Sequence, residues 1–188
     1  MKSRGIIFRS DMVRAIREGR KTQTRRLLKC DDAANADDVF FEERGGFWFP
    51  VVEVGDGVFH AQGDPIRCPY GVPGDELWVR ETWAWADLRW SNVPIVYRAD
   101  GDSQPCAEGR WRPSIFMPHE ASRLTLVVRS VRVERLSAIT DADAVAEGFK
   151  ACDGCVECFI TAFRQMHKLA ADADPWLWVV GFERKASP

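Results

Sequence analysis

The sequence has no long hydrophobic run and no strong excess of charge of either sign. Its apolar stretches are broken by charged residues well short of the roughly 20 positions needed to span a bilayer, and its first residues lack the apolar core of a signal peptide. We therefore expect a cytoplasmic protein with no membrane partner. A formal net charge of −2 argues against coating long nucleic acid through bulk electrostatics, and leaves a nucleotide-sized or locally anionic ligand open.

Cysteine is also scarce, because six in 188 residues are too few for a secreted disulfide scaffold. Three of them, Cys152, Cys155 and Cys158, have the two-residue spacing of zinc knuckles, but a tetrahedral site needs a fourth ligand and none is adjacent. The candidates for that ligand are Cys68, Cys106, His60, His119 and His167. Reduced, partly buried thiols are the default interpretation, with no required cofactor and a structural zinc as the alternative. His119 and His167 taken individually are interpreted as structural histidines.

Internal repeats and low-complexity tracts are absent as well. A length of 188 residues with 46% hydrophobic composition predicts one elaborated domain over residues 1–188, with long loop insertions at about 30–75 and 100–120. The acidic, apolar-poor segment Asp31–Asp38 is typical of a solvated loop.

Alternation of apolar and polar residues and β-branched runs predict most of the secondary structure as strands. The expected strands are Lys2–Arg9, Thr22–Leu28, Phe47–Val54, Val58–Ala61 (joined to the preceding strand by a hairpin turn at Gly55–Gly57), Glu76–Glu81, Ile95–Arg98, Leu124–Val133 and Trp176–Glu183. The expected helices are Ser10–Glu18 with Ser10 as N-cap and Gly19 as stop, one from a capping box at Thr140 to Gly148, and Cys158–Ala171. Many strands with few helices predict an α+β protein built on a small, partly closed β-barrel.

The most informative segment is Gly19–Arg26, which combines a glycine, three arginines, one lysine and two threonine hydroxyl groups in close succession. Between Arg14 and Lys29 seven cations accompany Glu18 alone, a local balance of +6. A solvated basic helix end, favoured by the helix macrodipole, is one interpretation. The other is chemical, since a neutral lysine amine can take the proton of a hydroxyl that attacks a carbonyl, provided that burial and neighbouring cations lower the pKa of the lysine.

Geometry limits the chemical interpretation, because Lys21 and Thr24 would point to opposite faces of a regular strand. They meet only if the chain turns or bulges between them. Glu147 is the candidate carboxylate partner, since it lies in the last turn of its expected helix, where the macrodipole disfavours negative charge and stability does not explain it well. An ordinary exposed glutamate is the alternative.

The pattern Gly19-x-Lys21-x-x-Thr24-x-Arg26 resembles the signature of ASCH domains, members of the PUA-like superfamily, with threonine in place of the usual glutamate. This variant is similar to the small bacterial ASCH amidohydrolases that remove the acetyl group from N4-acetylcytidine, and the segment 139–147 resembles the helix that carries their glutamate. The resemblance implies a PUA-like β-barrel of the ASCH type flanked by a few helices. It also implies that Lys21 is the general base, Thr24 the nucleophile, and Glu147 the group that positions the lysine or relays its proton.

The chain as a whole also resembles longer ASCH-like proteins of bacteriophages and prophages. This likeness depends on three segments, Gly71–Trp83, Trp111–Ser114 and Pro175–Val179. It implies the same fold with additional loops around the site.

The ligand expected from these observations is a nucleoside or RNA. Candidate substrate-binding residues are Arg20, Arg25, Arg26, Tyr70, Trp83 and Trp111. The three aromatic rings would stack a base, although core or loop packing explains each of them equally simply. Removal of an N4-acyl group from cytidine is the leading function because a pure binder needs no hydroxyl beside the lysine. A non-catalytic RNA or modified-base binding module and a ribonuclease are the alternatives, and the oligomeric state is open.

Overall fold

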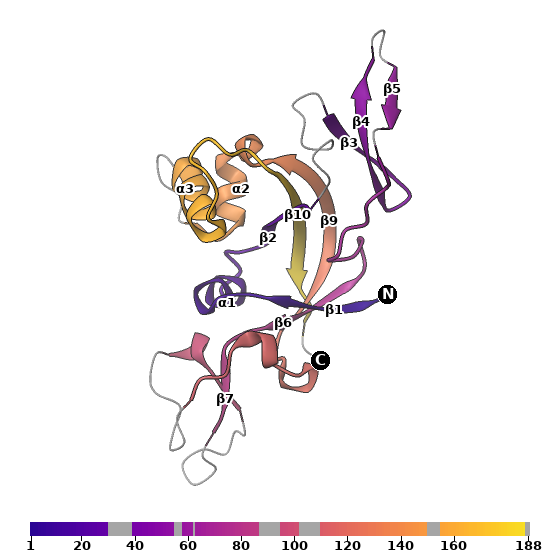
Figure 1. Ribbon diagram of the computed structural model, residues 1–188. Helices are drawn as coiled ribbons and strands as arrows, with labels where there is room; N and C mark the ends of the chain where they lie inside the picture. The colour runs from indigo at the N-terminus through magenta and orange to yellow at the C-terminus, as the bar shows by residue number, and fades with distance from the viewer. Residues whose placement is uncertain are drawn as a thin grey trace.

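The computed structural model describes residues 1–29, 39–54, 58–61, 63–86, 95–101, 110–149 and 155–186. This part of the chain is a mixed α and β protein, mostly sheet, with ten strands and three α-helices. The central sheet has the order β1-β6-β9-β10-β2 (Figure 1). Its strands are β1 (Ser3–Ile7), β6 (Glu76–Arg80), β9 (Thr125–Arg135), β10 (Trp176–Arg184) and β2 (Gln23–Leu27). The expected loop Asp31–Asp38 and the turn Gly55–Gly57 lie outside the described residues.

The central sheet is open, and its edge strands are β1 and β2. β1 pairs with β6 in parallel, and the other neighbours are antiparallel. No closed barrel forms among the described strands. The two edges are linked at one point, because the Arg26 guanidinium on β2 donates through Nη2 to the Ile7 carbonyl on β1 at 2.7 Å.

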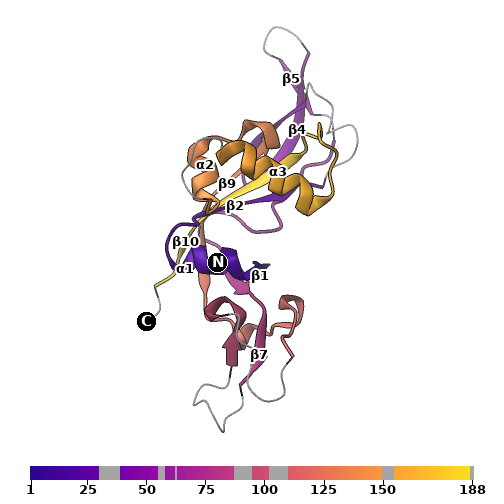
Figure 2. The same cartoon turned by 90° about the vertical axis from the view of Figure 1, so that its left-hand side faces the viewer.

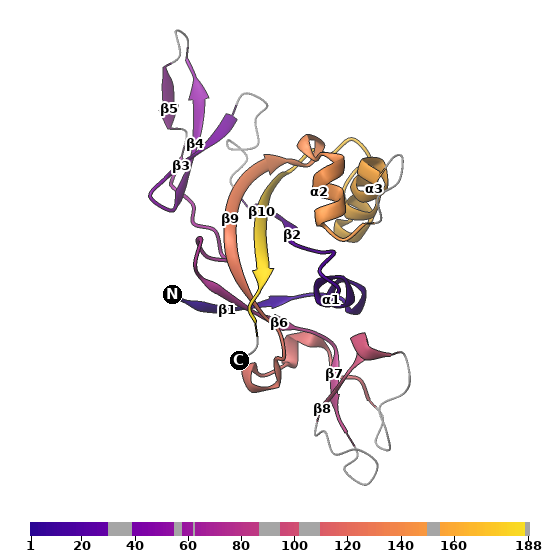
Figure 3. The same cartoon turned by 180° about the vertical axis from the view of Figure 1, so that it is seen from behind.

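The three helices lie on one side of the sheet, at the left in Figure 1 and at the right in Figure 3. They are α1 (Ser10–Arg17), α2 (Asp141–Ala146) and α3 (Cys155–His167). The predicted capping box of α2 is confirmed, since Thr140 and Asp143 exchange side-chain and backbone hydrogen bonds. The predicted N-cap of α1 is wrong: Arg9 is the extended flanking residue, and Ser10 is already helical.

Strand β10 separates two apolar clusters because its side chains alternate between the two faces of the sheet. Trp176 and Trp178 belong to the main core, where they pack edge-on against Phe41 and Trp48 at centroid distances of 5.1 and 5.9 Å. Leu177 points the other way into the cluster under α2 and α3. This single strand therefore packs against α2 and α3 on one face, and on the other against the main core, to which Val13 and Ile16 of α1 belong.

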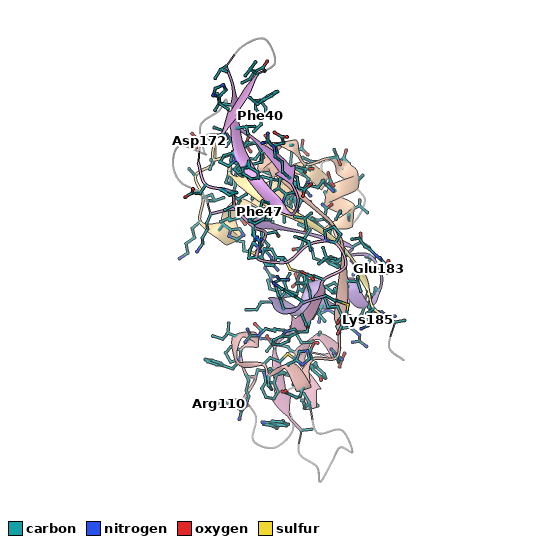
Figure 4. The ribbon with its side chains drawn as sticks, turned by 90° about the vertical axis from the view of Figure 1, so that its right-hand side faces the viewer. Phe40, Phe47, Arg110, Asp172, Glu183 and Lys185 are labelled. Carbon is teal, nitrogen blue, oxygen red and sulfur yellow. The ribbon has the colours of Figure 1, made fainter. Side chains whose placement is uncertain are left out.

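Two extensions project from opposite ends of the sheet (Figure 2). One is a three-stranded arm of β3 (Val39–Arg44), β4 (Phe47–Glu53) and β5 (Phe59–Ala61), and the other carries β7 (Trp83–Trp85) and β8 (Ile95–Tyr97). In Figure 4, Phe40 and Phe47 mark the arm, and Arg110 marks the other extension. The expected loop insertion at 30–75 thus contains a small sheet. Among the described residues, no helix is long and apolar enough to cross a membrane.

Asp75 fixes the start of β6 against β1, and its carboxylate accepts hydrogen bonds from Arg4 Nη1 and the Lys2 backbone N–H, both at 2.7 Å. These bonds lower the pKa of Asp75 to about 2. A depressed carboxyl pKa adds stability above its unfolded value, and that stability is lost as the pH falls through the folded pKa. When the pH falls from about 4 to 2, the free energy of unfolding should therefore decrease less in Asp75→Asn than in wild type. The difference between the two decreases should be at most about 2 kcal/mol.

Denaturant unfolding measured at several acidic pH values tests this expectation, with the exposed aspartate variant Asp172→Asn as control. Equal acid sensitivity of wild type and Asp75→Asn would show that Arg4 and Lys2 contribute nothing to folding through this carboxylate.

Candidate functional site

The segment that follows α1 is held against the end of α2 by backbone hydrogen bonds. The Lys21 N–H donates to the Ala15 carbonyl at 3.1 Å, and the Thr22 N–H donates to the Ala146 carbonyl at 2.8 Å. Lys21 and Glu147 form an isolated antiparallel bridge. Two residues that are 126 positions apart in the sequence are therefore held side by side by backbone pairing as well as by their side chains.

Gly148 makes this close approach possible. Its φ of +96° is in the left-handed region that favours glycine. A Cβ at this position would lie 3.2 Å from the Ala15 Cβ and 3.3 Å from the Lys21 Cβ. A side chain here would strain the backbone and push α1 and Lys21 away from α2.

The Lys21 ammonium and the Glu147 carboxylate form a buried pair. Nζ donates to Glu147 Oε2 at 2.6 Å and to the Glu147 carbonyl at 2.9 Å, and the exposed fractions of the two side chains are 0% and 5%. Burial lowers the pKa of Lys21, Glu147 opposes that shift, and Arg26 adds to it. The pKa of Lys21 is therefore lowered overall, and a lowered pKa is what a lysine needs in order to act as a base.

Arg25 joins this pair to further carboxylates behind it. Its fully buried guanidinium donates from Nη2 to Glu134 Oε2 at 2.9 Å and lies 3.3 Å from Asp143 Oδ2. Arg132 bridges the same two carboxylates from the outer side. Burial alone would raise the pKa of Asp143, but the hydrogen bonds from Thr140 and the charge of Arg25 hold it at about 2.

The network balances three cations with three carboxylates, yet it leaves polar atoms unused. Its members are Lys21, Arg25, Arg132, Glu134, Asp143 and Glu147. Arg25 Nη1 and Glu147 Oε1 are 4.0 Å apart, and neither of these buried atoms has a hydrogen-bond partner among the described residues. One carboxylate oxygen of Glu147 thus faces Arg25 while the other holds Lys21.

A cavity of about 350 Å³ opens beside Glu147, between α1 and α3. Its apolar lining includes Phe149, Phe159, Phe163 and Met166, and its polar lining includes Glu147 together with Arg9, Asp11 and Arg20. A site with aromatic walls and a few polar groups at one end is typical of small-molecule binding. The buried ion pair therefore lies next to a space of ligand size, which Glu147 helps to line.

Thr24 lies in β2 opposite Val180 of β10, and it is buried. Alternation along the strand places it on the face of Arg26, away from Gln23 and Arg25. Among the described residues, no hydrogen bond joins the Thr24 hydroxyl to the Lys21 amine, which donates to the carbonyl and to Oε2 of Glu147. The structure thus brings Lys21 and Glu147 together and leaves Thr24 outside that pair.

The three predicted binding arginines have separate positions. Arg20 lines the cavity, where it pairs with Glu18 and donates to the Gly148 carbonyl at 3.1 Å. Arg25 is enclosed in the charge network. Arg26 packs over the Phe8 ring at 5.2 Å while it links the sheet edges, and burial lowers its pKa.

The three predicted stacking rings lie away from the cavity lining. Tyr70 packs half-buried against the main core, and burial raises its pKa although Arg26 opposes this. Trp83 is buried beside Met117 in the extension that carries β7 and β8. Trp111 is half-buried, and it lies next to Arg112, which pairs with Trp83 through an isolated bridge.

Of the expected metal ligands, Cys152 and Cys106 lie outside the described residues. Cys155 is buried and Cys158 is exposed on α3, and the described part of the chain contains no group of three metal-ligating side chains. The rings of two histidines have aromatic neighbours: His119 packs edge-on to Trp78, and His167 lies against Phe163 at 4.4 Å.

Sequence reasoning did not identify Glu134, Asp143 and Arg132 as members of the charge network, nor the aromatic wall of the cavity. Asp143 is the third helical residue of the capping box at Thr140, and Phe159 and Phe163 are four positions apart, which is the spacing of one helix face. The sequence pattern does not reveal the long-range strand pairing that brings α2 and β9 next to β2.

Comparisons of the chain with protein-family models, with curated proteins and with solved structures find no match. The geometry of the site and the motif Gly19-x-Lys21-x-x-Thr24-x-Arg26 therefore carry the functional inference.

The buried pair should show strong energetic coupling. Lys21→Met leaves Glu147 as a buried charge without its main partner, and Glu147→Leu does the same to Lys21, so each should lower the free energy of unfolding by about 3 to 5 kcal/mol. The double variant should lose much less than the sum of the two, because no unpaired charge remains at this position.

Urea unfolding of the four proteins gives this coupling energy directly. The exposed pair Arg129–Glu183 provides the matched control, in which little coupling is expected. Additive losses at Lys21 and Glu147 would mean that the two side chains do not depend on each other.

Proposed function

We propose that the chain is an ASCH-type, PUA-like domain whose site at Lys21 and Glu147 hydrolyses the N4-acyl group of a cytidine-type substrate. One observation carries this proposal. A buried lysine with a lowered pKa is hydrogen-bonded to a glutamate that lines a ligand-sized cavity. Perturbed titratable groups beside a cavity are typical of catalytic sites.

The arrangement of the motif supports the assignment to this class of fold. Gly19 ends α1 with a φ of +75°, Lys21 is enclosed against α2, and Arg26 links the two edges of the central sheet. Each defined position of the pattern other than Thr24 therefore has a distinct structural role.

The cavity supports a planar, polar ligand. A volume of about 350 Å³ is at the lower end of the range for small-molecule sites. Phe149, Phe159 and Phe163 offer flat apolar surfaces for a base, and Arg20 and Glu147 offer a donor and an acceptor for its polar edge.

In the proposed reaction, neutral Lys21 takes the proton of the Thr24 hydroxyl as its oxygen attacks the acyl carbon. The tetrahedral intermediate collapses when Lys21 returns that proton to the departing N4 amine, which breaks the C–N bond and leaves an acyl ester on Thr24. Water then hydrolyses the ester and releases the carboxylic acid. Since Nζ is bonded to Glu147 at rest, it must turn toward Thr24 when substrate binds.

A second candidate is base recognition without hydrolysis. The observation that favours it is that, among the described residues, the Lys21 amine donates to Glu147 twice and not to Thr24. In this case the ion pair would shape one end of the cavity that recognises the base.

Hydrolysis of N4-acetylcytidine, followed by its ultraviolet spectrum, tests the proposal. Lys21→Met, Glu147→Gln and Thr24→Val should each reduce kcat roughly 10²- to 10⁴-fold, as expected for loss of a base, its partner or a nucleophile. Thr24→Ser should retain much of the activity. The wild-type rate should rise with pH through the lowered pKa of Lys21, since only the neutral amine accepts a proton.

Exposed residues of the same types provide controls, and Lys29→Met and Glu157→Gln should leave the rate unchanged. No acetate release by wild type at high enzyme concentration, together with measurable binding of cytidine, would replace the hydrolase with the base-binding module. Full activity of Thr24→Val would transfer the nucleophilic role from Thr24 to water.

A further inference from the structure

Arg25 and Glu147 approach each other without forming a hydrogen bond. The Arg25 side chain has no exposed surface, and its Nη1 lies 4.0 Å from Glu147 Oε1. Neither of these two buried atoms has a hydrogen-bond partner among the described residues. Buried polar atoms are normally hydrogen-bonded, so an unpaired donor that faces an unpaired acceptor requires an explanation.

The guanidinium of Arg25 is fixed from its other side. Nη2 donates to Glu134 Oε2 at 2.9 Å and lies 3.3 Å from Asp143 Oδ2. Because the guanidinium is planar and its donors form a rigid fork, these contacts also fix the direction of Nη1. Closure of the gap between Arg25 and Glu147 therefore requires movement of the Glu147 carboxylate.

The Glu147 side chain can make this movement while its backbone stays in place. The Glu147 N–H donates to the Asp143 carbonyl at 2.8 Å, and the backbone also pairs with Lys21. The carboxylate itself is held at Oε2 by Lys21 Nζ at 2.6 Å, and the last torsion of a glutamate has a broad energy minimum. A shift of Oε1 by about 1 Å would bring it within hydrogen-bond distance of Arg25 Nη1.

We propose that Arg25 is a positioning residue that takes over the Glu147 carboxylate when Lys21 turns toward Thr24. The movement of Lys21 in this inference rests on the proposed function. While Lys21 is charged, its ammonium is the nearer partner of the carboxylate. A neutral amine is a weaker donor than the guanidinium, which stays charged. The exchange keeps the buried carboxylate paired throughout, which avoids the cost of an isolated buried charge.

A crystal structure of Lys21→Met tests this exchange without any substrate. Methionine removes the ammonium and keeps an unbranched side chain at this position. Arg25 Nη1 and Glu147 Oε1, which are 4.0 Å apart in wild type, should then lie within about 3.2 Å of each other. A separation that remains at the wild-type value would overturn the inference.

NMR titration of Lys21 in Arg25→Lys provides a second test, which does not depend on the folding of Lys21→Met. The substitution keeps the charge but removes the fork, so that one ammonium cannot serve Glu134 and Glu147 together. Loss of the alternative partner should make neutral Lys21 less favourable and raise its pKa by about one unit. The variant leaves unchanged the charged groups that act directly on Lys21, which are Glu147, Arg26 and Asp11.

Arg132→Lys is the matched control, because Arg132 pairs with the same two carboxylates, Glu134 and Asp143, from the outer side of the network. It should move the pKa of Lys21 much less than Arg25→Lys does. Urea unfolding of both variants shows whether they are folded. Equal Lys21 pKa values in wild type and Arg25→Lys, or an equal shift in the two variants, would refute the exchange.

The outcome for Arg25 is separable from the outcome for hydrolysis. If wild type releases no acetate from N4-acetylcytidine, the proposed function fails, while the Lys21→Met structure and the Lys21 pKa still decide on the exchange. If wild type is active, kcat of Arg25→Lys below the Lys21 pKa should fall about tenfold with KM unchanged, since the neutral fraction of Lys21 is tenfold smaller. Hydrolysis with an unchanged Lys21 pKa in Arg25→Lys keeps the hydrolase and refutes the exchange.

Discussion

A lysine that is buried away from water must lose its charge or pair with a counter-charge. In this protein the counter-charge is Glu147, 126 positions further along the chain. Lys21 has no exposed side-chain surface, and its ammonium lies 2.6 Å from the carboxylate of Glu147. Because burying two charges costs several kcal/mol for each ion, the surrounding structure must hold both with little freedom. The backbone bridge between the two residues and the close approach of Gly148 supply that restraint.

The charge network behind the pair surrounds the Glu147 carboxylate with cations. Arg25, enclosed between Glu134 and Asp143, places a positive charge 4.0 Å from the second oxygen of Glu147. Lys21 holds the first oxygen at 2.6 Å. In the proposed reaction Arg25 stays beside Glu147 when Nζ turns toward Thr24.

Much of the fold was predictable because local signals and burial agree. β10 was expected at Trp176–Glu183 and extends over Trp176–Arg184, and the capping box at Thr140 placed α2 correctly. The end of α3 was not predictable from composition. The helix was expected to reach Ala171, but it ends at His167, since Lys168 adopts a φ of 54°, a conformation that usually calls for glycine.

The sequence predicted the pairing of Lys21 with Glu147, which the structure shows, while the catalytic roles of both residues stay predictions. The alternation rule indicated that Thr24 meets the lysine only if the chain turns between them, and no hydrogen bond joins the two among the described residues. Strands β3 and β7 were missed because both are short, with six and three residues, and short segments carry a weak periodic signal. The position of Arg25 depends on long-range pairing of β2, β9 and α2, which no local pattern encodes.

The proposed chemistry requires that Lys21 is a buried amine whose pKa is lowered although it touches a carboxylate. Isotope-edited NMR of the lysine side chains over a pH titration measures this pKa directly, with Lys21→Met used to assign the signal. Lys21 should titrate below the ordinary lysine value of about 10.4, and lower still in Glu147→Gln, where the opposing carboxylate is removed. Titration of Lys21 at or above the ordinary value would rule out its role as a base near neutral pH.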